Sequence, residues 1–279
     1  MINISSVPHR SPFRYPGGKT WFVPYFRTWV KSQKKRPTTL IEPFTGGGII
    51  SLTAASESLA DEIIMVEVDP QVAAVWKTII SGDIQSLINR ILKFDMSMET
   101  AQEVLDSTPT DIQDIAFQTI IKNRTSHGGI LATGAGLMKR GENGRGILSR
   151  WYPETIAKRL RDIVAYKNKI KFIQQDAFTV IADYSKRKDV IFFIDPPYSV
   201  KGSKSAGSRL YTHWQIDHDK LFSDLTNVEG DFILTYDNSP GVVALATKYG
   251  FCYKPVSMRN TRNVEMTELV IGRNLDWLK

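Results

Sequence analysis

Two short apolar runs, joined by a glycine turn and a helical stretch, constrain the fold of this chain more than any other part of its sequence. Residues 39–43 (TLIEP) and 62–68 (EIIMVEV) are rich in β-branched side chains and predict strands. The segment between them opens with three glycines and continues as a helical stretch, GGGIISLTAASESLA. A strand, a glycine turn, a helix and a second strand form a βαβ unit, which requires a parallel sheet with helices on its faces.

Later segments continue the alternation of strands and helices. Residues 69–80 predict a helix that Asp69 caps, with Pro70 at its first position. Further helices are predicted at 84–94 and 98–105, buried strands at 190–194 and 230–237, and a turn followed by a strand at 263–274. The glycine-rich residues 128–146 predict a long loop instead. We therefore expect an α/β fold with a mostly helical, basic insert at about residues 90–165.

Composition excludes several classes of protein. Apolar residues make up 42% of the 279 residues and aromatic residues 10%, which excludes an intrinsically disordered chain. No apolar run approaches the roughly 18 residues that a membrane span needs. The first 13 residues lack the apolar core of a signal peptide. We therefore expect a cytoplasmic protein with no membrane partner.

Cysteine and histidine are too sparse to suggest a metal site. The single cysteine, Cys252, excludes an intrachain disulfide and any site with several thiolate ligands. The four histidines show no ligand spacing with one another, so we expect no metal. Cys252 itself lies in an apparent strand, where we expect it to pack in the core.

Positive charge is concentrated in two regions. The net charge of the chain is +7, and residues 119–171 alone hold twelve Lys and Arg against three acidic residues. A second cluster, at residues 27–36, holds five more Lys and Arg. Such segregation favours a surface that binds phosphates, although an ordinary solvated basic surface would have the same composition.

A glycine turn follows the first predicted strand. Residues 42–48 (EPFTGGG) place glycines where the backbone can approach a ligand closely and where a helix begins with free N–H groups. About 20 residues further on, Glu67 and Asp69 stand at the end of the second strand, where a carboxylate binds ribose hydroxyls in nucleotide-binding folds. Because Asp69 is accounted for as a helix cap, we assign the ribose contact to Glu67.

The most specific pattern is IDPPYS at residues 194–199, directly after the buried strand VIFFI. Its two prolines fix the chain, so that the Asp195 carboxylate and the Pro196 carbonyl become two rigid acceptors. Such a pair suits an amino group with two N–H donors, and Tyr198 offers a flat face on which a planar ring can stack. The competing interpretation is a strand-ending double-proline turn with a capping aspartate.

Five motifs occur in the order FRYPGGK (13–19), EPFTGGG (42–48), VEVD (66–69), QDAF (175–178) and DPPY (195–198). Over nearly the whole chain, this set resembles the Dam-type DNA adenine methyltransferases of class alpha. The resemblance implies a Rossmann-like catalytic domain that binds S-adenosylmethionine, formed by residues 1–90 and 166–279. It also implies a mostly helical target-recognition domain inserted at residues 91–165.

The resemblance further implies which residues bind the cofactor. The expected cofactor residues are Tyr15, Gly17, Lys19, Phe44, Gly46, Gly48, Glu67, Asp176, Phe178 and Asp195. Tyr15 stands where the family often has Trp or Phe, and Glu67 where it often has Asp; both changes keep stacking and ribose bonding. Residues 123–130 (NRTSHGGI) look like a family segment other than the one in GATC-reading enzymes, which leaves the target sequence open.

An activity follows from the same resemblance: methyl transfer from S-adenosylmethionine to the exocyclic amino group of adenine in double-stranded DNA, as part of a restriction–modification system or alone. The base would be flipped out of the duplex and methylated in line. The expected catalytic residues are Asp195, Pro196, Pro197 and Tyr198. The alternatives are transfer to the amine of cytosine or to RNA, and a non-catalytic DNA-binding module. A carbon methyltransferase would instead need a cysteine nucleophile, for which Cys252 is the one candidate.

The basic insert is the expected DNA-binding region. Lys139, Arg140 and Arg145 lie in its glycine-rich loop. Arg124 and Arg150 flank that loop, where they would either brace it or contact bases.

Two segments after the DPPY motif have less specific interpretations. Residues 211–218 form either a lid over the target base or an ordinary helix start. Asp237 is expected to act as a cap or in a turn. We expect the protein to act as a monomer, with two copies at one DNA site as the alternative.

Overall fold

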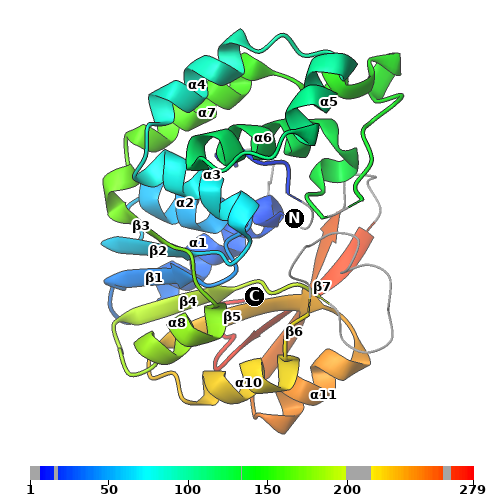
Figure 1. Cartoon of the computed structure of the whole chain (residues 1–279). Helices are drawn as coiled ribbons and strands as arrows, with labels where there is room; N and C mark the ends of the chain where they lie inside the picture. Colours follow the sequence, from blue (N-terminus) through cyan, green and yellow to red (C-terminus); the bar gives the residue numbers. More distant parts are fainter. Residues whose placement is uncertain (1–6, 16–17, 133, 199–214, 260–264) are drawn as a thin grey trace.

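In the described part of the chain, seven strands form one sheet that runs through the middle of the protein (Figure 1). The computed structural model describes residues 7–15, 18–132, 134–198, 215–259 and 265–279. The strands are β1 (Thr39–Glu42), β2 (Glu62–Val66), β3 (Ile170–Ile173), β4 (Val190–Ile194), β5 (Asp231–Asp237), β6 (Cys252–Arg259) and β7 (Glu265–Gly272). Strands β1 to β5 are parallel, and β7 is antiparallel to both β5 and β6. The α/β class predicted from the sequence is confirmed.

The order of the strands, β3-β2-β1-β4-β5-β7-β6, reverses between β1 and β4. From β1 the chain proceeds outward through β2 to β3, and from β4 it proceeds outward in the other direction through β5. In open α/β sheets, ligands bind outside the carboxyl ends of the strands at such a reversal. The EPFTGGG turn follows β1 and the DPPY turn follows β4, so these two motifs meet at that point.

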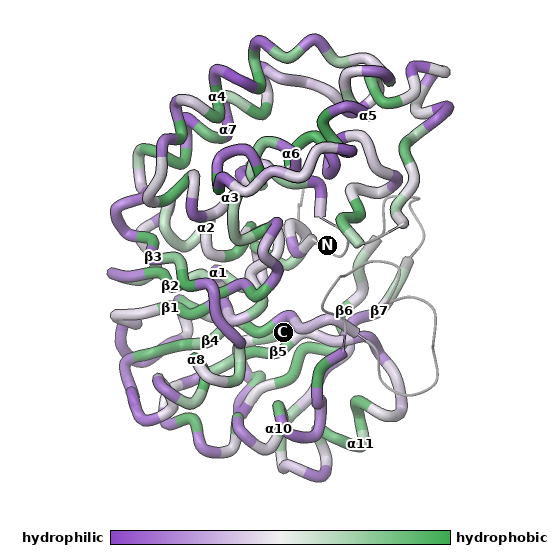
Figure 2. Tube along the Cα trace, viewed as in Figure 1, coloured by the Kyte–Doolittle hydropathy of each residue, from purple (hydrophilic) through white to green (hydrophobic). Residues whose placement is uncertain are grey.

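Each face of the sheet has its own hydrophobic core, because side chains alternate along the buried strands. Ile191 and Phe193 of β4 pack toward one face, whereas Phe192 and Ile194 pack toward the other. Strand β4 is hydrophobic along its length (Figure 2). Burial of each side chain of this size contributes roughly 1.5–3 kcal/mol to the stability of the fold. The first face is covered by α1 (Val23–Ser32), α2 (Ile49–Ser56) and α3 (Pro70–Ile80), and the second by α8 (Ala177–Tyr184), α10 (His218–Thr226) and α11 (Pro240–Lys248).

A layer of further helices lies on top of α3 (Figure 1). In the sequence, these helices come after α3 and before β3. The helices of this helical layer are α4 (Ile84–Lys93), α5 (Met98–Asp106), α6 (Ile112–Thr125) and α7 (Pro153–Val164). The helices predicted at 84–94 and 98–105 are therefore confirmed. A parallel crossover needs only one helix, so these four are an addition to the basic fold. Helix α6 packs on α3, and buried residues such as Ile88, Ile120 and Leu160 join the core of the first face.

The glycine-rich loop within this layer forms no α-helix in its described residues, as predicted. It contains the short 3-10 turns η2 (His127–Gly129), η3 (Glu142–Gly144) and η4 (Gly146–Arg150). Ser126 and Leu137 form an isolated antiparallel bridge, and the side chains of Met138 and Ile147 are buried. The loop is thus anchored to the helices below it at several points.

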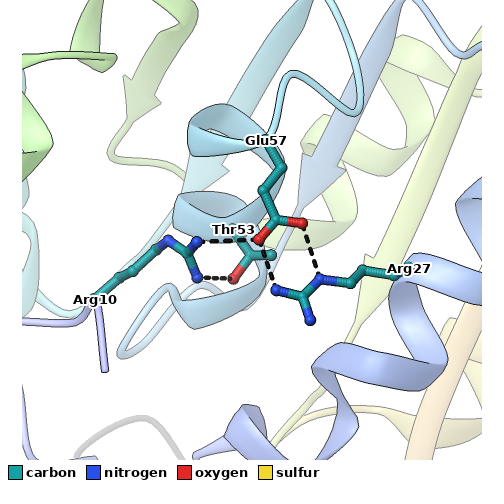
Figure 3. A network of polar contacts seen from close by, with 4 residues as sticks. All are labelled: Arg10, Arg27, Thr53 and Glu57. Atoms are coloured by element: carbon teal, nitrogen blue, oxygen red, sulfur yellow. Dashed lines mark hydrogen bonds and ion pairs between the residues drawn. The ribbon is translucent and has the colours of Figure 1, made fainter. Parts of the chain in front are cut away.

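A network around Glu57 ties the N-terminal segment to the first two helices (Figure 3). Arg27 of α1 donates two hydrogen bonds to the Glu57 carboxylate, at 2.8 and 2.7 Å. Arg10 donates to Oε1 of the same carboxylate at 3.0 Å and to Thr53 at 3.4 Å. Glu57 follows α2, so one acid fixes the N-terminal segment against both helices.

Candidate active site

The glycine turn after β1 has a backbone shape that favours glycine. Gly46 and Gly48 have φ angles of +46° and +63°, in the left-handed region, and Gly48 is the N-cap of α2. The Gly46 N–H donates to Oε2 of Glu67 at 2.9 Å, and its carbonyl accepts from Nε1 of Trp76 at 2.9 Å. The turn is therefore held by residues at the end of β2 and on α3.

The ring of Tyr15 lies directly against this turn. A Cβ atom on Gly46 would come within 2.5 Å of Cε1 of Tyr15, and one on Gly47 within 2.9 Å of the Tyr15 Cβ. The segment that carries Tyr15 is fixed by Asn123 of α6, which accepts from the Arg14 N–H and donates to the Arg14 carbonyl, both at 2.8 Å. The structure thus brings together the aromatic residue and the glycines that the sequence assigned to one site.

The two acids after β2 have different roles. Oδ1 of Asp69 accepts from the N–H groups of Gln71 and Val72, which confirms that Asp69 caps α3. Glu67 accepts from the N–H groups of Val68 and Asp69 at 2.9 and 3.0 Å, in addition to that of Gly46. Burial raises the pKa of Glu67 to about 7. These three contacts leave about one of the four acceptor positions of the Glu67 carboxylate for a ligand.

A further acid, Glu42, lies at the end of β1 and was not singled out from the sequence. Its side chain is only 3% exposed and accepts from the N–H of Ser51 at 3.0 Å. Burial raises the pKa of Glu42 to about 8, and the negative charges of Asp195 and Glu67 add to the effect. The available signal was an acid as the last residue of a buried strand, directly before the glycine turn.

The carboxylate of Asp195, at the end of β4, is held through one of its oxygens. Oδ1 accepts from the Tyr198 hydroxyl at 2.6 Å and the Thr235 hydroxyl at 2.8 Å, and it lies 2.9 Å from Nζ of Lys19. Pro196 is buried and Pro197 half-buried. All the contacts that the described residues make with this carboxylate are to Oδ1. They fix the plane of the carboxylate and therefore also the direction in which Oδ2 points.

Tyr198 turns its hydroxyl toward the acids of the site. Its ring stacks on Tyr236 of β5, with 5.4 Å between the ring centroids and 29° between the planes. The Lys19 ammonium lies 5.1 Å from the centroid of the Tyr198 ring. Burial raises the pKa of Tyr198 well above its ordinary value, so the phenol stays protonated and its hydroxyl donates a hydrogen bond to Asp195. Stacking of a base on Tyr198 remains a prediction.

A second acid beside Asp195, Glu268 of β7, was also missed at the level of sequence. Lys19 is 3% exposed, and its Nζ lies 3.3 Å from Oε2 of Glu268. Burial lowers the pKa of Lys19, but the charges of Asp195 and Glu268 outweigh it and the net shift is upward. Burial also raises the pKa of Glu268, against the opposing charge of Lys19. The available signal was an acid directly before the apolar run LVIG.

The remaining cofactor residues named from the sequence lie on or near the second face of the sheet. Asp176 is exposed and caps α8, since its Oδ1 accepts from the N–H groups of Phe178 and Thr179. Phe178 and Phe44 are partly buried against the core of that face. Gly17 lies outside the described residues.

The basic residues of the insert differ in exposure. Those exposed in the glycine-rich loop are Lys139, Arg140 and Arg145. Arg150 is half-buried. Arg124 is only 5% exposed, and its guanidinium donates to the carbonyl of Pro12. Burial and the charges of Arg159 and Arg14 lower the pKa of Arg124 to about 9. This position fits the bracing role predicted for Arg124, and a contact with DNA bases stays a prediction.

Cys252 does not pack in the core, and that prediction is wrong. It is exposed at the start of β6, which is an edge strand of the described sheet. Its partner in the register is Gly272, whereas Glu268 pairs with Val256. Four residues of strand separate these positions, so Cys252 lies about 13 Å along the strand from the acid cluster.

Two further predictions concern the segments after DPPY. Residues 211–214 lie outside the described part, and Asp217 caps α10 by accepting from the Lys220 N–H at 2.9 Å, which fits an ordinary helix start. Asp237 ends β5, and its carbonyl accepts from the Ser239 N–H at 2.9 Å, which fits the predicted turn. Among the described residues, no three His, Cys, Asp or Glu side chains are grouped to hold a metal ion, and no helix has the length and apolarity to cross a bilayer.

Part of the chain matches the model of a known protein family. Residues 15–115 match the model of the D12 class N6 adenine-specific DNA methyltransferases, a region that includes Lys19, the glycine turn and Glu67. No curated protein matches the chain. Among solved structures, it is similar to a Pyrococcus horikoshii protein provisionally described as an RNA methyltransferase, with 12% identity over 93% of this chain and 85% of that one and a TM-score of 0.41. It is also similar to precorrin-6y C5,15-methyltransferase from Geobacter metallireducens GS-15, with 10% identity over 88% and 84% and a TM-score of 0.35. Both similarities are distant and do not bear on the substrate.

Proposed function

From its D12 class N6 adenine-specific DNA methyltransferase domain, this chain is a methyltransferase, and we propose that it methylates the exocyclic amine of adenine in double-stranded DNA. The proposal is carried by the geometry around Asp195, a residue outside the region that matches the family model. Asp195 of the DPPY turn is fixed by Lys19, Tyr198 and Thr235 at the carboxyl edge of the sheet, beside the glycine turn. A rigid acceptor at this edge suits an amino group as substrate.

The residues around the glycine turn fit S-adenosylmethionine. Its ribose hydroxyls need an acceptor, which the remaining position on Glu67 provides, and its adenine needs flat or apolar contacts, which Tyr15, Phe44 and Phe178 offer. Gly46 and Gly48 allow the backbone to approach it, and Asp176 and Lys19 complete the proposed set. When bound, S-adenosylmethionine supplies a methyl group activated by a sulfonium.

Asp195 would act through its second oxygen. Oδ2 and the Pro196 carbonyl would accept the two N–H groups of the target amine and direct its lone pair toward the methyl group. As the new N–C bond formed and the methyl–sulfur bond of the sulfonium broke, S-adenosylhomocysteine would be the leaving group, and the positive charge that develops on the nitrogen would be stabilised by the fixed carboxylate. The nitrogen then releases one proton to Asp195 or to water. Pro197 keeps the turn rigid.

DNA would be bound by the helical layer, with residues 91–165 as the target-recognition domain and residues 1–90 and 166–279 as the catalytic domain. The exposed loop cations Lys139, Arg140 and Arg145 would contact the duplex, with Arg150 beside them. Because the amine of adenine is paired within the duplex, the base would be flipped out and would meet Tyr198.

Nucleoside analysis tests this function. The purified chain is incubated with S-adenosylmethionine and genomic DNA that lacks methylated bases, and the nucleosides are analysed by mass spectrometry. We expect N6-methyladenine, and less than about one-tenth of the rate from Asp195→Ala, because this change removes an acceptor that acts on the transition state. N4-methylcytosine, or methylation of RNA alone, would contradict the proposal.

The same assay tests for a thiol mechanism. Cys252→Ser should keep turnover within about twofold, because Cys252 lies about 13 Å along the strand from the acid cluster. Complete loss of activity in a folded Cys252→Ser protein, together with a covalent DNA adduct in the wild type, would point to a cysteine nucleophile instead.

A further inference from the structure

Glu268 reaches the DPPY turn because of the direction of β7. This strand is antiparallel to β5, with Asp237 opposite Glu268 in the register. Asp237 is the last residue of β5, so Glu268 lies at the carboxyl edge of the parallel strands, where Asp195 also lies. The Glu268 residue is 9% exposed.

Glu268 and Asp195 share the same two donors. Lys19 Nζ lies 2.9 Å from Oδ1 of Asp195 and 3.3 Å from Oε2 of Glu268. The Tyr198 hydroxyl lies 2.6 Å from the former oxygen and 3.3 Å from the latter. One ammonium therefore faces two carboxylates, and the cluster carries an excess of one negative charge when both acids are ionised.

This excess charge matters for the proposed reaction. If Lys19 faced Asp195 alone, the ammonium would cancel most of the negative potential of that carboxylate, because screening by water is weak at a buried site. Because Glu268 faces the same ammonium, the positive charge of Lys19 is shared between two carboxylates and cancels less of the negative potential of Asp195. Asp195 then keeps negative potential at Oδ2, where the amine nitrogen becomes positively charged.

We propose that Glu268 is a positioning residue for methyl transfer: it pairs with Lys19 and Tyr198, so that the Asp195 carboxylate keeps negative potential at Oδ2 and its orientation for the target amine. The inference rests on the function proposed above, and it assigns Glu268 no contact with the substrate. A purely structural ion pair would stabilise the fold equally well but would leave the chemical step unchanged in the folded fraction.

Charge and shape can be separated by substitution. Glu268→Gln keeps the size of the side chain and removes its charge, whereas Glu268→Asp keeps the charge on a shorter side chain. Glu229→Gln is the matched control, because Glu229 is an exposed acid that pairs with Lys186 and Lys188 at 3.8 Å. Single-turnover rates on DNA, KM values for S-adenosylmethionine and DNA, and melting temperatures are measured for each protein.

We expect Glu268→Gln to lower the rate of the chemical step about tenfold or more while both KM values stay within about twofold. Glu268→Asp should recover part of that rate, and Glu229→Gln should match the wild type. The inference is overturned if Glu268→Gln transfers as fast as the wild type, or if its loss equals its loss of folded protein.

A double substitution gives a second, independent result. Lys19→Met with Glu268→Gln removes one charge of each sign and leaves Asp195 as the one ionised group of the trio. At saturating S-adenosylmethionine, this protein should transfer faster than Glu268→Gln alone, whose Lys19 faces Asp195 without a competitor. A double variant as slow as Glu268→Gln or slower overturns the charge argument.

The two levels of proposal fail in different ways. If the wild type forms no N6-methyladenine in any DNA, the proposed function fails whatever Glu268 does. If the wild type is active and Glu268→Gln is equally active, only the role of Glu268 fails.

Discussion

The hydroxyl of Thr235 donates to Oδ1 of Asp195 at 2.8 Å, across the pairing of β5 with β4. Thr235 is fully buried, and it comes one residue after Leu234, which pairs with Ile194. The regular register of two parallel strands thus places a donor beside the carboxylate that follows the first of them. The sheet itself orients the group on which the proposed reaction depends.

Thr235→Val should slow methyl transfer while keeping the fold, because valine has nearly the same shape and lacks the donor. Loss of one such hydrogen bond is expected to cost about 0.5–1.5 kcal/mol, or roughly 2- to 13-fold in single-turnover rate. Thr235→Ser, which keeps the hydroxyl, is the control and should lose less. Equal rates for Thr235→Val and the wild type would show that Lys19 and Tyr198 suffice to orient Asp195.

Gly46→Ala should destabilise the protein and weaken its affinity for S-adenosylmethionine. The new Cβ would lie 2.5 Å from the Tyr15 ring and would stand on a backbone with φ of +46°. Backbone strain alone costs of order 1–3 kcal/mol. Gly250→Ala separates the two effects, since Gly250 has φ of +71° and no atom lies within 4 Å of its Cβ position among the described residues.

Chemical denaturation and calorimetric titration with S-adenosylmethionine would measure both glycine variants. Gly46→Ala should lose more stability than Gly250→Ala, and only Gly46→Ala should lose affinity. Equal effects of the two substitutions on stability and binding would contradict close packing of Tyr15 on the turn.

Glu42→Gln should change the pH dependence of stability. The folded state holds the Glu42 proton up to about pH 8, whereas the unfolded state loses it near the ordinary value of 4.5. Between these values the folded state binds more protons, so the contribution of Glu42 to stability falls as pH rises, by up to about 1.4 kcal/mol per pH unit. The neutral amide lacks this dependence and can still accept from the Ser51 N–H.

Urea unfolding at pH 5, 7 and 8 would compare Glu42→Gln with the wild type. The stability of the variant relative to the wild type should improve steadily from pH 5 to pH 8. A difference that stays constant over this range would mean that Glu42 is ionised in the folded protein.

Lys139→Ala should weaken DNA binding through the phosphate backbone, because Lys139 is an exposed cation of the glycine-rich loop. Binding to all sequences should weaken alike, and the slope of log K against log salt should fall in magnitude by about 0.9. Lys186→Ala is the control, since Lys186 is an exposed cation beyond α8, on the face of the sheet away from the helical layer. An unchanged slope for Lys139→Ala would exclude this residue from the contact surface.

Much of the fold could be predicted because its signals are local. The helix at α3 follows from Asp69 and Pro70, and the turn before α2 follows from its glycines. The acid cluster could not be predicted in the same way. Its geometry depends on the position of β7 between β5 and β6, which no local pattern around Glu268 encodes.

The burial of single residues could not be predicted from local sequence in the same way. Cys252 is exposed because β6 ends the described sheet, so one of its edges has no neighbouring strand. Arg124 is buried because the N-terminal segment crosses α6, where the carbonyl of Pro12 accepts a hydrogen bond from the Arg124 guanidinium. Both outcomes depend on which segment lies beside the residue, and neither the identity of the side chain nor its near neighbours in the sequence decide that.

The contact between Lys19 and Glu268 joins a residue before the first strand to a residue on the last strand of the described sheet. Contacts so distant in sequence form late in folding, because the loop-closure entropy must be overcome first. Because unfolding reverses the folding path, contacts that form last are the first to be lost, and they can open before the sheet unfolds as a whole. Heating should therefore abolish methyl transfer at a temperature at which β1, β2 and β4 are still paired. Cooling from that temperature should restore activity, because the protein has not unfolded as a whole.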